Sequence, residues 1–156
     1  MEKISLNNAL SFSFPDGFRR LSETEMKQLR YAWSGAGECL RDDGRHIIVS
    51  LAYKNAGFLS GLLGSGDLIK NAQSRIAGAM RSYSYRLTGY ENRRVGDRAA
   101  QSFQYAYAAQ GVGMAAECCA VKAGKTIYYL HFYVREACRE EGFRLWKQVL
   151  ADARWT

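Results

Sequence analysis

The sequence predicts one α+β domain in which helices pack on a twisted antiparallel sheet of about six or seven strands, an α/β/α sandwich. Three observations lead to this prediction. Strand-like runs follow one another with very short connections, which is typical of an antiparallel meander. Two longer segments repeat apolar residues at helical spacing. Helical segments separated by groups of strands favour a layered α+β arrangement over a parallel sheet.

The first segment, residues 3–14, predicts two short strands joined at Asn7-Asn8. In the second strand Leu10, Phe12 and Phe14 alternate with serines, the period-2 pattern of a strand with one buried face. The Pro15-Asp16-Gly17 sequence that follows is a turn signal and ends the strand.

A short helix is expected from Ser22 to Tyr31. Ser22 followed by Glu25 forms a capping-box pattern, in which each side chain bonds the backbone N–H of the other residue. Residues 38–42 and 45–54 then predict a hairpin around Asp43-Gly44.

Residues 55–66 are glycine-rich and predict a loop, and the helix that follows is expected over residues 67–83. Strands and a last helix complete the chain, with Gly-containing turns between the strands. The expected strands are residues 84–95, 99–109, 113–122 and 126–134, and the last helix is expected from Glu136 to Arg154.

Composition places the whole chain, residues 1–156, in a single domain. The 47% hydrophobic and 24% charged content is that of a folded globular protein, and one proline leaves no stiff linker. The N-terminus has no apolar core typical of a secretory signal, and no run of about 18 apolar residues predicts a membrane span. We therefore expect a cytoplasmic protein with four free thiols, in which Cys118 and Cys119 point to opposite faces of one strand.

Motifs for catalysis, cofactor binding and metal binding are not found. A phosphate-binding loop requires a Lys-Ser or Lys-Thr after its glycines, whereas Asp67 follows the glycine-rich loop here. Cys138 and His131 form the one plausible nucleophile–base combination, and the aromatic strand around His131 favours a core histidine instead. The sequence predicts no catalytic residue, no cofactor and no metal site, and hence no enzyme.

Two regions are candidate binding surfaces. The loop carries Phe58, Leu59, Leu62 and Leu63, which either present an apolar patch to a partner or fold back over the sheet as a lid. The second region runs from Arg86 to Arg98 and includes Arg93, Arg94 and Arg98, beside several tyrosines. It suggests an anionic ligand or nucleic acid as the alternative partner. The scattered basic residues elsewhere disfavour nucleic acid, because such binding needs a continuous basic face.

The segment LSFSFPDGF, Leu10 to Phe18, together with the capped helix after it, resembles the opening of PsbP-like proteins. Residues 84–154, the meander and the last helix, fit the same architecture. This fold superfamily includes the photosystem subunit PsbP, the Mog-type Ran-binding factor and a bacterial DcrB-like group. Some of the bacterial members resemble chaperones that hold apolar segments of secretion effectors.

The resemblance implies a non-enzymatic binding role, and it carries over no functional residue because the superfamily has no common active site. The secretion or lipoprotein signal of many bacterial relatives is missing from this sequence, which argues against a periplasmic role. We therefore expect a protein-interaction or chaperone-like module whose partner is an apolar or anionic protein segment, with a homodimer as one form. An enzyme with an unrecognised site is the third hypothesis.

Overall fold

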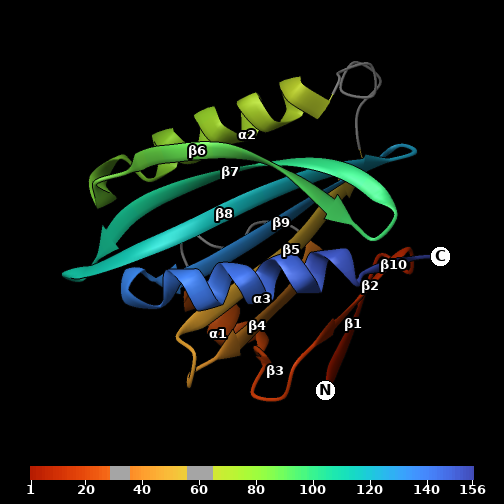
Figure 1. Ribbon diagram of the computed structural model, residues 1–156, viewed down its shortest axis with the longest axis horizontal. Helices are drawn as coiled ribbons and strands as arrows, with labels where there is room; N and C mark the ends of the chain where they lie inside the picture. The colour runs from red at the N-terminus through yellow and green to blue at the C-terminus, as the bar shows by residue number, and fades with distance from the viewer. Residues whose placement is uncertain (29–35, 56–64) are drawn as a thin grey trace.

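The computed structural model describes residues 1–28, 36–55 and 65–156 (Figure 1). Residues 29–35 and 56–64 lie outside the described part of the chain. The helices are α1 (Glu23–Gln28), α2 (Ser65–Ala79) and α3 (Arg139–Ala151), with short 3-10 turns at Arg81–Tyr83 and Glu136–Cys138. The strands are β1 (Glu2–Leu6), β2 (Leu10–Phe14), β3 (Arg19–Arg20), β4 (Ala36–Asp42), β5 (Ile47–Asn55), β6 (Arg86–Val95), β7 (Arg98–Ala109), β8 (Val112–Ala123), β9 (Thr126–Arg135) and β10 (Arg154–Trp155).

A seven-stranded antiparallel sheet in the order β3-β4-β5-β9-β8-β7-β6 forms the middle of the molecule. The predicted meander is confirmed, because β6, β7, β8 and β9 are neighbours in chain order. β9 lies between β5 and β8 and is buried on both faces, as its continuous apolar and aromatic sequence predicted. Figure 1 shows the strong twist of the sheet.

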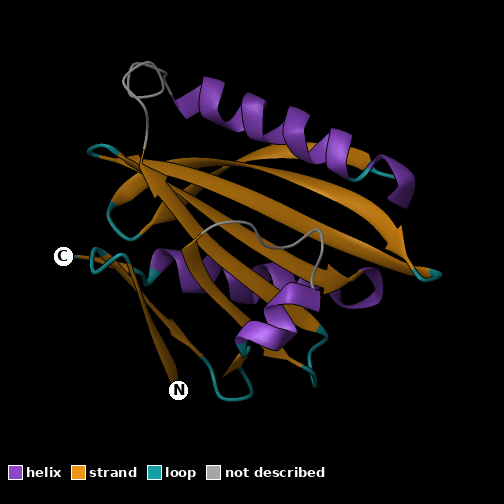
Figure 2. Ribbon diagram, turned by 180° about the vertical axis from the view of Figure 1, so that it is seen from behind, coloured by secondary structure: helices purple, strands orange, loops and turns teal. Residues whose placement is uncertain are grey.

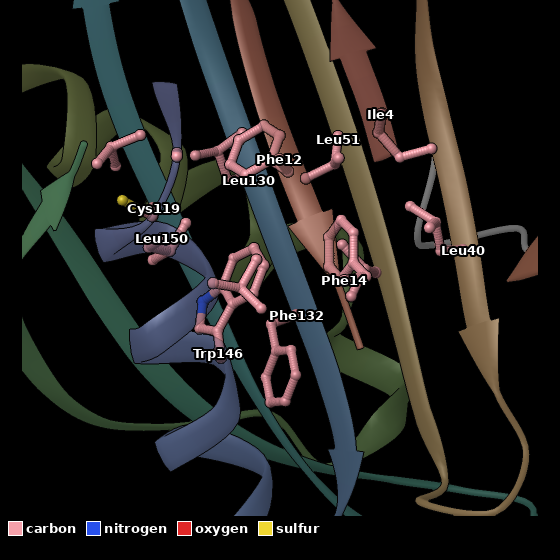
Figure 3. Packing of buried hydrophobic residues seen from close by; sticks show 14 of the residues in the cluster. Ile4, Phe12, Phe14, Leu40, Leu51, Cys119, Leu130, Phe132, Trp146 and Leu150 are labelled. Carbon is pink, nitrogen blue, oxygen red and sulfur yellow. The ribbon is translucent and has the colours of Figure 1, made fainter. Parts of the chain in front are cut away.

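One face of the sheet packs against α3 and against a separate small sheet with the order β1-β2-β10. The alternating Leu10, Phe12 and Phe14 of β2 are fully buried there, as the period-2 pattern predicted. Trp146 of α3 stacks on Phe132 of β9, with ring centroids 5.2 Å apart (Figure 3). This packing explains how a two-stranded hairpin, marginal by itself, is held in place.

The opposite face packs against α2 and is rich in tyrosine. Tyr105, Tyr107 and Tyr133 are buried together under α2, in one cluster with Ile69 of α2 and with Met80, the residue after the helix. α1 lies on the same side as α2, where Figure 2 shows it in front of the strands. Cys118 belongs to this core and Cys119 to the core under α3, so the two neighbouring thiols do point to opposite faces.

Several local predictions are confirmed in detail. The Ser22 Oγ accepts the Glu25 N–H at 3.2 Å and the Glu25 carboxylate accepts the Ser22 N–H at 3.1 Å, so the capping box is formed. Asn7 and Asn8 both have positive φ, at 56° and 51°, which is the geometry of a tight hairpin turn.

Within the described residues, no helix has both the length and the apolar run that a bilayer span requires.

The predicted last helix, Glu136 to Arg154, is wrong at both ends. The α-helix starts at Arg139 after a 3-10 turn, and it ends at Ala151. Arg154 and Trp155 leave the helix to form β10 on the edge of β2. The reason is tertiary, since the Trp155 indole N–H donates to the Val95 carbonyl at 2.7 Å and its ring packs edge-on against Tyr128.

Candidate functional site

β6 is an edge strand of the seven-stranded sheet, and β7 is its neighbour within the sheet. It is ten residues long, and most of its side chains are exposed. Leu87 is 37% exposed and Tyr90 is 51% exposed, which is unusual for large apolar side chains on a free strand edge. The ring centroids of Tyr90 and Phe103 lie 6.5 Å apart, so contact with the buried Phe103 partly fixes the position of Tyr90.

A β-bulge at Thr88 determines which side chains of this strand share a face. Leu87 pairs with Tyr105, whereas Gly89 already pairs with Gln104, so Thr88 is the extra residue. Leu87 and Tyr90 are three positions apart and would point to opposite faces of a regular strand. The bulge places both on the α2 side of the sheet, together with Asn92 and Arg94.

An open groove runs along this edge between α2 and the β6–β7 hairpin. One part, about 430 Å³, is lined by Ile69 and Lys70 of α2, by Tyr90, Glu91 and Asn92 of β6, and by Gln101 and Ser102 of β7. An adjoining hollow of about 270 Å³ shares Asn92 and Gln101 and extends to Arg94. The groove therefore combines the apolar Ile69 and Tyr90, two cross-strand amides, the acid Glu91, and the cations Lys70 and Arg94.

Arg93 points to the other face and is engaged inside the molecule. Its guanidinium donates two hydrogen bonds to the fully buried Glu117 carboxylate, at 2.8 and 3.2 Å. Gln104 and the indole N–H of Trp146 also donate to Glu117, at 3.0 and 2.9 Å. A buried carboxylate with four donors is well compensated, and this network ties α3 to three strands. Arg93 thus supports the fold, and it also borders the smaller hollow.

The other two arginines singled out in the sequence have different surroundings. Arg94 donates to the backbone carbonyl of Asp97 at 2.7 Å and remains exposed. The Arg98 guanidinium lies 4.8 Å from the ring centroid of Trp155. Arg93, Arg94 and Arg98 therefore do not form a continuous basic row, which is what a nucleic-acid surface needs. The apolar residues Phe58, Leu59, Leu62 and Leu63 lie outside the described residues.

His131 and Cys138, the one nucleophile–base combination in the sequence, are not brought together. His131 stacks on Tyr133 in the α2-side core, whereas Cys138 packs against the α3-side core. Burial and the positive charge of Arg75 lower the pKa of His131 to about 4, and burial raises the pKa of the Cys118 and Cys119 thiols. Over the described ranges, no three His, Cys, Asp or Glu side chains converge as a metal ion would require.

Comparison of the sequence with protein-family models and with curated proteins gives no match. Solved structures do match the fold. Cyanobacterial PsbP (CyanoP) from Synechocystis superposes with a TM-score of 0.70 over 99% of this chain and 92% of its own, at 13% identity. This chain has a PsbP-like fold.

Two further structures share the PsbP-like fold at low identity. LpqN of Mycobacterium tuberculosis, described as involved in cell envelope biogenesis, matches with a TM-score of 0.62 at 11% identity, over 94% of this chain and 83% of its own. A Pseudomonas aeruginosa protein of unknown function, described as a putative regulator, matches with a TM-score of 0.55 at 14% identity, over 97% and 94%. The grouping with DcrB-like proteins stays a prediction.

The PsbP-like fold alone does not single out the groove, and the sequence pointed to its β6 strand but not to its α2 side. Leu87 and Tyr90 lie within the 86–98 region that the sequence singled out for its arginines and tyrosines, whereas Lys70 and Gln101 were not identified. The sequence signal for the groove was the aromatic Tyr90 between Gly89 and Glu91. It could not be interpreted without the position of the bulge, which decides the face on which Tyr90 lies.

Proposed function

We propose that this chain is a non-enzymatic module that binds a segment of another protein at the β6 edge. The observation that carries the proposal is the long, exposed edge strand that presents Leu87 and Tyr90 beside an open groove. Natural proteins normally protect such edges, because an unpaired strand is a template for another chain. An exposed edge with apolar side chains is therefore a candidate contact surface.

A photo-crosslinking experiment tests this function. The crosslinker p-benzoylphenylalanine is placed at Tyr90 in the groove and, as a matched control, at Val112, which is 38% exposed at the start of β8. We expect a discrete protein adduct from position 90 in cells, and its loss in a Leu87→Asp variant. Equal adducts at both positions, or none at position 90, would contradict the proposal.

The apolar residues of the 56–64 segment are a second proposed contact, in line with a chaperone-like role. The double substitution Leu62→Asp, Leu63→Asp tests this contact. Loss of the same crosslinked partner would place these residues in the interaction, whereas an unchanged adduct would limit it to the β6 edge.

An anionic ligand is the alternative partner, because Lys70 and Arg94 flank the groove while the chain carries a net charge of +7. Salt-dependent retention on heparin or RNA discriminates this alternative. Retention that disappears in a Lys70→Glu, Arg94→Glu variant would favour a free anion or nucleic acid over a protein segment. A cytoplasmic location and a homodimeric form remain proposals, which cell fractionation and sedimentation test.

A further inference from the structure

We propose that the partner binds as an added strand on β6 and that it is an extended acidic segment, in which apolar and acidic side chains recur on one face. This inference rests on the proposed function and specifies the chemistry of the partner. The backbone of β6 provides the binding mode, and the side chains of the groove provide the selectivity.

The backbone argument starts from the antiparallel ladder. Alternate residues of an edge strand direct their N–H and C=O groups away from the sheet, where a new strand can bond them. The register of β6 with β7 runs from Arg86↔Ala106 to Val95↔Arg98 and is interrupted only at the Thr88 bulge, so the inner side of the strand is paired on both sides of the bulge. Ten residues correspond to a strand of about 33 Å, which is enough for a partner segment of about eight residues.

The side-chain argument concerns the α2 side of the edge. Leu87 and Tyr90 form its apolar half, and Asn92 and Arg94 form its polar half. Because side chains of an added strand alternate between faces, every second residue of the partner would face this row. An apolar residue fits beside Tyr90, and carboxylates two and four positions along the partner fit beside Asn92 and Arg94 respectively.

The charged side chains of the groove predict the sign of the charge on the partner. The cations at the groove are Lys70 on α2 and Arg94 on β6, and within the described residues neither forms an ion pair. The acid Glu91 also lines the groove, but its side chain belongs to the α3 side of β6, where its carboxylate lies 3.8 Å from the Arg93 guanidinium and is partly balanced by it. An acidic segment is therefore complementary, whereas a second copy of this chain would bring together two molecules of charge +7.

Synthetic peptides test the proposal by fluorescence anisotropy. The probe is a capped, labelled octapeptide in which Phe, Glu and Glu occupy alternate positions between threonines, and it is made in both sequence orders to allow either strand direction. Replacing both Glu by Lys should weaken binding by about tenfold or more. Methylating the amide nitrogens at every second residue of the peptide removes their hydrogen bonds. When the methylated nitrogens are those that face β6, binding should also weaken by about tenfold or more.

Protein variants with matched charge supply the control. Lys70→Glu with Arg94→Glu should weaken peptide binding by about tenfold or more. Lys3→Glu with Lys147→Glu changes the net charge equally at exposed positions of β1 and α3, and it should leave binding within about twofold. All four positions are on the surface, and circular dichroism and the melting temperature establish that each variant is folded.

The outcomes separate this inference from the function on which it rests. Suppose that the Tyr90 adduct forms, but the methylated peptides, or the peptides with Lys in place of Glu, bind as tightly as the original ones. The proposal of an added acidic strand is then wrong, while the proposal of protein binding stands. If neither adduct nor peptide binding occurs, both proposals fail. A dimer that dissociates on Leu87→Asp substitution would identify a second copy as the occupant and overturn the acidic partner.

Discussion

Glu117 shows how much a single buried residue can determine in this fold. Its carboxylate joins Arg93, Gln104 and Trp146, three side chains from three different elements. Removing its charge leaves the Arg93 guanidinium, which is 10% exposed, with only the more distant Glu91 carboxylate, at 3.8 Å, as a counter-charge.

We therefore expect Glu117→Gln to lower the free energy of unfolding by about 3 kcal/mol or more. Urea denaturation measures this, with Glu140→Gln on the surface of α3 as the control. Replacing both partners, Arg93→Met with Glu117→Leu, should recover part of the loss, because no buried charge is then left unpaired. A Glu117→Gln protein as stable as the control variant would contradict this role.

His131 is the residue whose titration should shape the pH dependence of stability. Its Nδ1 is buried and, in the described part of the chain, has no hydrogen-bond partner. The pKa of the folded-state imidazole is lowered from 6.5 to about 4, so the unfolded chain binds the proton more readily between these values.

Stability should be complete above about pH 6.5 and fall as the pH drops toward 4, by up to about 3 kcal/mol. His131→Phe, which keeps a ring against Tyr133, should remove most of this slope. The exposed His46 provides the control: its φ of 57° suits asparagine, and His46→Asn should keep the slope. Denaturation midpoints measured from pH 4 to pH 8 decide between the two histidines.

At the scale of elements, the approach of α3 to the sheet depends on a glycine. A Cβ on Gly142 would lie 2.9 Å from Cγ2 of Val134 and 3.3 Å from Cζ of Phe132. The helix therefore packs more closely on β9 than a larger residue would allow.

Gly142→Ala should lower the free energy of unfolding by about 1–3 kcal/mol through overpacking. Gly78→Ala in α2 is a matched control, because a Cβ there meets no atom within 4 Å. That control should be neutral or more stable by up to about 1 kcal/mol, since alanine is the better helix former. Thermal melts of the two variants should move apart, and equal shifts would contradict the close approach.

Prediction from sequence succeeded for elements whose burial pattern is local. The alternation in β2, the capping box of α1 and the short turns of the meander each express their structure within a few residues. Prediction failed where a distant partner decides. The helical period continues past Ala151, and the Val95 carbonyl that captures Trp155 is remote in the sequence. The groove was hidden for a related reason, because one extra residue, Thr88, reverses the alternation.

At the scale of the whole molecule, two cores share one sheet. The α3-side core contains Trp146, and the α2-side core contains Tyr105, Tyr107 and Tyr133. Because the strands between them are common to both cores, neither side should unfold alone.

We expect a single cooperative transition, in agreement with a single domain over residues 1–156. Tryptophan fluorescence in a Trp33→Phe background follows the α3-side core, and the assigned fluorotyrosine resonances of Tyr105, Tyr107 and Tyr133 follow the α2-side core. Their denaturant midpoints should coincide, and two separate midpoints would show two independently folding units.

The adjacent Cys118 and Cys119 offer a chemical view of the same sheet. The Cys118 side chain is buried under α2 and the Cys119 side chain is buried under α3, although the two residues are joined by one peptide bond. Alkylation followed by peptide sequencing would therefore record, at neighbouring positions, whether the two layers open together. Modification of Cys118 alone would report exposure beneath α2, and modification of Cys119 alone would report exposure beneath α3.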